Sequence, residues 1–144
     1  MPAWTDAAVE EYVRRLPREF AIELVEIKPE PRNRGRSVAQ LLAAEARRIA
    51  AATQGWRMVA LDEHGEAWTT ARLATRLSAW RERAEDVAFV IGSADGLAAE
   101  VKRDADVIVA LSALTLAHGV ARVLLAEQLY RAASMLGGHP YHRA

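Results

Sequence analysis

The residues of this sequence that could do chemistry gather toward its C-terminal end. His118 and Arg122 are four residues apart, at the start of a helix expected over Gly119 to Leu136, so their side chains share one helical face. Histidine titrates near neutral pH, and the pair could serve a reacting base and an RNA phosphate. The chain also ends with a cluster of polar side chains: His139, Tyr141, His142 and Arg143. The simpler alternatives stay open, namely a helix cap or surface residue for His118 and a frayed end for the cluster.

Two loops that follow expected strands could hold a ligand. Gly92–Gly96 follows the strand Val87–Ile91, and the second loop begins where the strand Asp106–Leu111 ends. Ligands of open α/β sheets bind outside the carboxyl ends of the strands. A glycine there lets a ligand approach the backbone, and an apolar run can sandwich an adenine while backbone groups read its edge. The candidate residues are Gly92, Leu111, Ser112, Ala113, Leu114, Thr115 and Leu116. A structural turn and a core segment remain the competing interpretations.

Strands alternate with helices along the chain, which predicts an α/β domain with a mostly parallel sheet. Helices are expected over Trp4–Leu16, after the capping-box pair Ser37 and Gln40, and from Thr69 or Thr70. The expected strands are Phe20–Ile27, Trp56–Leu61, Val87–Ile91 and Asp106–Leu111. Residues Lys28–Arg36 are expected to form a loop, and Asp62–Gly65 to close the second strand.

Length and composition favour one globular domain over residues 1–144. No apolar run approaches the ~18 residues of a membrane span, so we expect no membrane association. The chain has no cysteine, which favours a cytoplasmic setting, and no pattern of ligands for a metal. Its 19 basic and 19 acidic residues cancel, so the chain as a whole has little long-range attraction for nucleic acid.

The helix expected over Gly119 to Leu136 is apolar around more than one stripe. One of its sides must therefore be covered by something other than the sheet of its own chain. A homodimer interface, with Leu125 as one outward-facing position, explains this most simply, and a deeply buried helix in a monomer is the alternative.

The same C-terminal stretch carries a family resemblance. LTLAHGVARVLLAEQLYRA, from Leu114 to Ala132, and the tail HPYHR are similar to the C-terminal signature of the RlmH family of ribosomal RNA methyltransferases, part of the SPOUT superfamily. EYVRRL, FAIELVEI, VALDEHGEAW and FVIGSADGL follow the order and spacing of that family. The resemblance thus covers essentially the whole chain.

The resemblance implies a single-domain α/β trefoil-knot fold, an obligate homodimer and S-adenosylmethionine as methyl donor. It implies methylation of N3 of a pseudouridine in 23S ribosomal RNA on the assembled ribosome. By position, the cofactor would contact Leu61, Gly92 and the run Leu111 to Leu116. The catalytic and RNA-facing candidates would be His118, Arg122, Tyr141, His142 and Arg143, with either His118 or His142 as base.

Three positions depart from the family pattern. The sequence starts at the first helix, without the strand with which the family usually begins, and it has Ser93 and Ala117 where a glycine and a proline are usual. A rival hypothesis is therefore a catalytically silent, dimeric SPOUT-type module that binds RNA or cofactor. Methylation of another RNA or of a protein is a further alternative.

Overall fold

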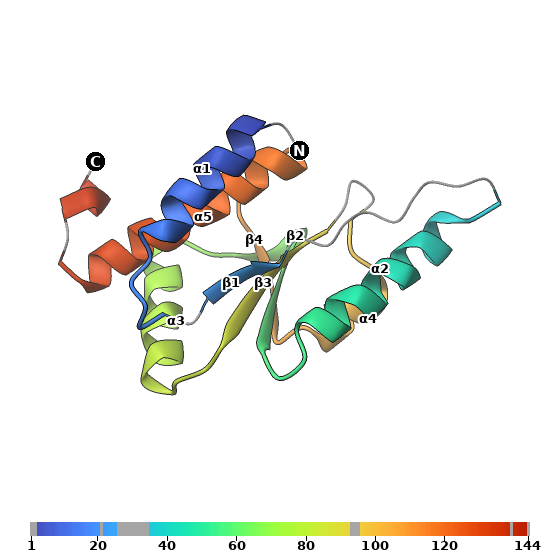
Figure 1. Ribbon diagram of the computed structural model, residues 1–144, viewed down its shortest axis with the longest axis horizontal. Helices are drawn as coiled ribbons and strands as arrows, with labels where there is room; N and C mark the ends of the chain where they lie inside the picture. The colour runs from blue at the N-terminus through green and yellow to red at the C-terminus, as the bar shows by residue number, and fades with distance from the viewer. Residues whose placement is uncertain (1–2, 21, 26–34, 93–95, 139, 144) are drawn as a thin grey trace. The chain divides into compact units, whose positions relative to one another are not determined.

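The computed structural model describes residues 3–20, 22–25, 35–92, 96–138 and 140–143. Its chain falls into two compact units built from interleaved segments. The sheet unit comprises Ile22–Glu66 and Asp86–Ala110, and the helical unit comprises Met1–Ala21, Ala67–Glu85 and Leu111–Ala144. Figure 1 labels the helices and strands of both units.

The sheet unit confirms the expected parallel α/β arrangement. Strands β1 and β2 both pair in parallel with β3, and the strand order is β1-β3-β2-β4. The elements are β1 (Ile22–Val25), α2 (Val38–Ala52), β2 (Arg57–Ala67), β3 (Val87–Ile91), α4 (Ala99–Asp104) and β4 (Val107–Ala110). Strand β3 is central and buried at its first four residues, as its unbroken apolar run predicts.

The core of the sheet unit lies between α2, α4 and the strands. Ile49 of α2, Val90 of β3 and Val101 of α4 belong to one buried cluster with Met58 and Leu97. The predicted capping box starts α2: Ser37 accepts a hydrogen bond from the amide of Gln40, whose side chain accepts one from the Ser37 amide. These contacts cap the N-terminal end of α2.

One prediction about the sheet is wrong. Asp62–Gly65 reads as a turn, but β2 continues without a break to Ala67. A Cβ added at Gly65 would lie 2.7 Å from backbone atoms of Ile108 and Val109, so the glycine allows close backbone approach to β4. Asp62 is also held in place, since its carboxylate accepts the His64 amide and pairs with Lys102 at 3.1 Å. Tertiary contacts thus override the turn-forming character of the segment.

The helical unit packs α1 (Ala3–Arg14) and α3 (Thr70–Glu82) against α5 (His118–Leu136). Figure 1 shows α1 lying along α5. Thr69 caps α3 through the amide of Arg72, as predicted. The predicted double glycine ends α5, with Gly138 in the left-handed region at φ 72°. A 3-10 turn, η1 (Pro140–Arg143), follows and packs on α5.

Within the described part of the chain, no helix is long and apolar enough to cross a membrane. The expected loop 28–36 is described only from Gly35 onward, and Ser93, Ala94 and Asp95 lie outside the described residues.

Candidate functional site

Gly92 stands at the carboxyl end of the buried central strand. The register pairs Leu61 of β2 with Ile91 of β3, so Leu61 and Gly92 lie next to each other, as the assignment of both to one site requires. A Cβ at Gly92 would meet the carbonyl carbon and oxygen of Gly96 at 2.5 Å. No other residue type fits there without moving the backbone. A glycine is therefore required at the end of β3, because the backbone of Gly96 approaches it closely.

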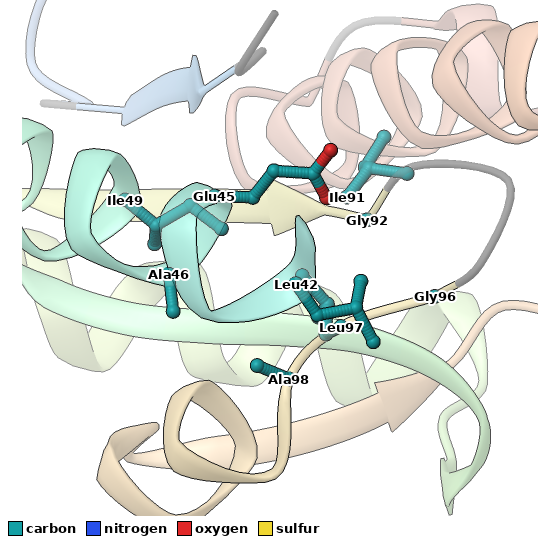
Figure 2. A pocket seen from close by; sticks show the side chains of 9 residues that line it. All are labelled: Leu42, Glu45, Ala46, Ile49, Ile91, Gly92, Gly96, Leu97 and Ala98. Atoms are coloured by element: carbon teal, nitrogen blue, oxygen red, sulfur yellow. The ribbon is translucent and has the colours of Figure 1, made fainter. Parts of the chain in front are cut away.

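A small hollow lies beside Gly92, between α2 and the turn that leads to α4 (Figure 2). Its interior volume is about 10 Å³, room for about one water molecule. Leu42, Ile91 and Leu97 give it an apolar lining, and Glu45 reaches its rim from α2. A nucleoside cannot enter this hollow. A cofactor that uses Gly92 must instead lie outside this hollow.

The run Leu111 to Leu116 directly follows β4 and lies in the helical unit. None of its six residues is buried, and the side chain of Leu114 is 74% exposed. The interpretation as a core segment is therefore wrong. Ser112 accepts a hydrogen bond from the amide of Leu114 at 2.9 Å, which bends the run into a tight turn. Apolar side chains and backbone groups are exposed together, an arrangement suited to an adenine.

His118 is the first residue of α5 and is partly buried, and Arg122 follows one turn later. The Arg122 side chain is only 11% exposed, and its guanidinium donates to Asp6 of α1 at 2.9 Å. Arg122 thus joins α5 to α1, in addition to any role toward RNA. Sequence reasoning missed Asp6, whose only signal is an acidic residue in the first turn of a helix.

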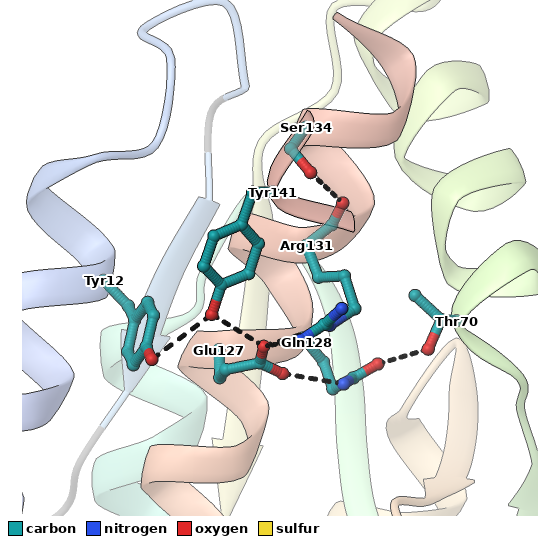
Figure 3. Close-up of polar contacts among 7 residues, drawn as sticks. All are labelled: Tyr12, Thr70, Glu127, Gln128, Arg131, Ser134 and Tyr141. Atoms are coloured by element: carbon teal, nitrogen blue, oxygen red, sulfur yellow. Dashed lines mark hydrogen bonds and ion pairs between the residues drawn. The ribbon is translucent and has the colours of Figure 1, made fainter. Parts of the chain in front are cut away.

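The C-terminal turn η1 is docked on the helical unit through Tyr141 (Figure 3). The Tyr141 hydroxyl donates to Glu127 Oε2 of α5 at 2.9 Å and lies 3.3 Å from the hydroxyl of Tyr12. Arg131 donates to the same carboxylate from Nε at 3.0 Å and from Nη2 at 2.8 Å. The side chains of His142 and Arg143 lie outside the described residues, as does His139.

Glu127, Tyr12 and Arg131 were not singled out as site residues from the sequence. The sequence offered one signal, the i, i+4 spacing of Glu127 and Arg131. By itself, this spacing predicts only an ordinary ion pair on a helix surface. Glu127 and Tyr141 are 14 residues apart in the sequence, and Tyr12 and Tyr141 are 129 apart. Neither hydrogen bond can therefore be predicted from local spacing.

The ionisation of this cluster follows from its contacts. Burial, the hydrogen bond with Tyr12 and the Glu127 carboxylate raise the pKa of Tyr141 above its ordinary value of 10.0. Burial alone would raise the pKa of Glu127, but the hydrogen bonds from Arg131 and Tyr141 together hold it below its ordinary value of 4.5. At neutral pH the pair is a neutral phenol donating to a carboxylate.

The lowered pKa of Glu127 predicts an acid-labile contribution to stability. This contribution is complete above about pH 4.5, the ordinary value, and disappears as the pH falls through the lower pKa of the folded state. Urea titrations between pH 7 and pH 3 should therefore show a smaller loss of unfolding free energy in Glu127→Gln than in the unchanged chain. Equal losses in the two proteins would contradict the assignment.

A basic surface formed by α3 and Trp68 was also not predicted from the sequence. Arg72 and Arg76, one turn apart on α3, place their guanidinium groups 5.9 Å and 5.2 Å from the centre of the Trp68 ring. Thr69 and Thr75 line the same open hollow. Cations held over an aromatic face beside hydroxyl groups suit an anionic backbone.

Comparisons with known proteins identify similar proteins over most or all of the chain. A family model described as "Predicted SPOUT methyltransferase" matches residues 1–142. Proteins called ribosomal RNA large subunit methyltransferase H from Nitrosospira multiformis and Burkholderia ambifaria are 55% and 56% identical to this chain. Each alignment covers 100% of this chain and 93% of the relative. The crystal structure of a methylase family protein from Neisseria gonorrhoeae superposes with a TM-score of 0.52 at 13% identity, over 86% of this chain and 76% of that one, and supports the fold alone.

Proposed function

The chain belongs to the SPOUT methyltransferase family, and from this premise we propose that it methylates ribosomal RNA of the large subunit. More specifically, it transfers the methyl group of S-adenosylmethionine to N3 of a pseudouridine in 23S ribosomal RNA. The observation that carries the proposal is an identity of 55–56% over the whole chain to proteins named ribosomal RNA large subunit methyltransferase H. Bound S-adenosylmethionine supplies an electrophilic methyl group.

The residues that would hold the cofactor are Leu61, Gly92 and the run Leu111 to Leu116. Gly92 fits this role because it directly follows the last residue of β3 and is only partly buried. Leu114 fits because its apolar side chain is exposed. Apolar contact on the adenine with backbone hydrogen bonds at its edge gives both affinity and selectivity.

On the RNA side, the chain must hold the pseudouridine ring and accept the N3 proton. An imide N–H is acidic enough that a histidine, which titrates near neutral pH, suffices as base. His118 and His142 are the candidates, and Arg122 and Arg143 would face phosphate or ring carbonyls. Because Arg122 already donates to Asp6, its contact with RNA would use the remaining donors of its guanidinium.

Recognition of RNA by a chain with zero net charge requires local basic surfaces. Arg72 and Arg76 over Trp68 supply one such surface in the helical unit. Few phosphate contacts give only weak non-specific binding, ~10⁻⁴ M or poorer at physiological salt. The substrate is therefore the assembled ribosome, where shape and several contacts act together.

We also propose a homodimer formed through α5. Its face turned away from α1 and α3 exposes Val120 and Leu124, each more than a third accessible. Two further apolar side chains of the helical unit, Trp4 and Val13, are exposed on α1. A second copy would cover apolar surface that the single chain leaves in water.

The decisive experiment supplies isotope-labelled S-adenosylmethionine to ribosomes isolated from cells that lack the modification. The expected result is one methyl group per ribosome, mapped by nuclease digestion and mass spectrometry to N3 of a pseudouridine. The isolated hairpin at 150 mM salt should react far more slowly than the ribosome. Cofactor binding without transfer would instead establish the silent module, and label in another RNA or a protein would refute the substrate assignment.

A further inference from the structure

Glu127 is the most heavily engaged acidic side chain in the described part of the helical unit. Besides Tyr141 and Arg131, it accepts a hydrogen bond from Gln128 Nε2 at 2.8 Å, and Gln128 in turn accepts one from Thr70 of α3 at 2.5 Å. Figure 3 shows the hydrogen bonds from Tyr141, Arg131 and Gln128 converging on the two carboxylate oxygens of Glu127. The carboxylate is therefore held from several directions and has one orientation. The proposed methyl transfer gives it no task of its own.

The ring of Tyr141 is fixed as firmly as its hydroxyl. It meets Tyr130 edge to face with ring centres 4.6 Å apart, and Tyr12 in the same way at 6.4 Å. The guanidinium of Arg131 lies 5.0 Å from the Tyr141 ring centre. Edge-to-face rings and a cation over a ring each add stabilisation beyond burial. Tyr141 thus has a defined socket made by α1 and α5.

Tyr141 belongs to the short turn η1, which comes after α5. It is four residues long and follows two glycines, Gly137 and Gly138, the second of which has a positive φ. A short segment after a flexible joint frays unless a side chain fixes it. The socket is the attachment that the structure shows.

We propose that Glu127 is a positioning residue: by accepting the Tyr141 hydroxyl, it fixes the turn Pro140–Arg143 and so sets where His142 and Arg143 are presented. Tyr141 then anchors the turn and does not itself act on the reacting ring. The raised pKa of Tyr141 agrees with this, because a phenol that stays protonated keeps donating to the carboxylate. Only the catalytic consequence of the proposal rests on the proposed function.

The first test measures the turn and needs no activity. Amide hydrogen exchange is followed at residues 141–143 in the full chain, in Tyr141→Phe and in Glu127→Ala. Tyr141→Phe removes one hydroxyl and keeps the ring in its socket. Exchange should quicken roughly ten- to a hundredfold in both variants, the loss expected for a hydrogen bond to a charged group. Unchanged exchange in Tyr141→Phe would overturn the proposal, even if Glu127→Ala failed to fold.

Ser134→Ala is the matched control. Ser134 lies on the same helix and donates to the carbonyl of Arg131 at 2.7 Å, without a contact to Tyr141 (Figure 3). Its loss also removes one hydroxyl, yet exchange at residues 141–143 should stay as in the unchanged chain. Faster exchange in this variant would mean that any perturbation of α5 loosens the turn, which also overturns the specific role of Glu127.

The second test measures methyl transfer to ribosomes. A positioning role predicts a fall in kcat of at least about tenfold in Tyr141→Phe, with the Kd for S-adenosylmethionine unchanged and the shape of the pH profile retained. Glu127→Gln should recover part of the activity lost in Glu127→Ala, because its amide oxygen still accepts the hydroxyl. Full activity in Tyr141→Phe, or loss of one limb of its pH profile, would overturn the proposal. If the unchanged chain transfers no methyl group, the proposed function fails, and hydrogen exchange still decides the role of Glu127.

Discussion

Gly92→Leu is expected to abolish binding of S-adenosylmethionine. The first added atom, Cβ, would already lie 2.5 Å from the carbonyl carbon and oxygen of Gly96 and 2.9 Å from Leu97 Cγ. Because these neighbours include the backbone of Gly96, either Gly96 or the end of β3 has to move, and the proposed contact of Gly92 with the cofactor is disturbed. Overpacking of this kind also costs roughly 1–3 kcal/mol of stability or more. Calorimetric titration with S-adenosylmethionine measures the first effect and urea unfolding the second.

Gly137→Ala is the matched control for this experiment. Gly137 has an ordinary φ of −90°, and a Cβ there would lie 3.6 Å from the nearest atom, the carbonyl oxygen of Ala133. Its substitution should leave both the cofactor Kd and the stability nearly unchanged. An unaltered Kd in Gly92→Leu would remove Gly92 from the cofactor site.

The predictions that the structure confirms rest on local physical chemistry. The Ser37 and Thr69 caps, the glycines that end α5 and the apolar run of β3 each follow from contacts within a few residues. A cap needs one hydroxyl and one amide at fixed spacing, and a buried parallel strand needs only an unbroken apolar run.

The features that the sequence concealed depend on contacts between distant segments. Residues Asp62–Gly65 have the composition of a turn, and only the approach of Ile108 shows why the strand continues. The partner of Arg122 is Asp6, 116 residues away. The Tyr141 socket combines side chains from α1 and α5 in the same manner. Spacing along one helix predicts which residues share a face, but not which other segment covers it.

The family resemblance identifies functional residues that periodicity alone does not. Like periodicity, it does not show which distant segments contact them. It placed Gly92, His118, Arg122 and Tyr141 among the functional residues without showing what surrounds each one. The surroundings change the meaning of two of them: Arg122 is engaged with α1, and Tyr141 with Glu127. The knotted chain path, the single domain and the dimer remain predictions.

Two adjacent leucines of α5 should give opposite results when replaced by glutamate. Leu125 is 1% exposed and packs inside the helical unit, whereas Leu124 is 37% exposed. The expectation from sequence that Leu125 faces outward is therefore wrong, since α1 and α3 cover that side of α5. Leu125→Glu buries an ionisable group without a partner and removes core packing, a loss of about 4–5 kcal/mol or more. That is comparable with the whole stability of a small domain, so we expect this variant to be unfolded or aggregated.

Leu124→Glu tests the proposed dimer without this complication. A polar side chain at a partly exposed helix position changes the stability of a single chain by only about 0.5 kcal/mol, so the fold should persist in circular dichroism. In a dimer formed through α5, two carboxylates would instead be forced into an apolar interface, and the protein should become monomeric. Light scattering and sedimentation at micromolar concentration measure this directly. A folded Leu124→Glu variant that keeps the mass of a dimer would exclude this face of α5 as the interface. An unchanged chain that is monomeric at the same concentration would exclude the dimer itself.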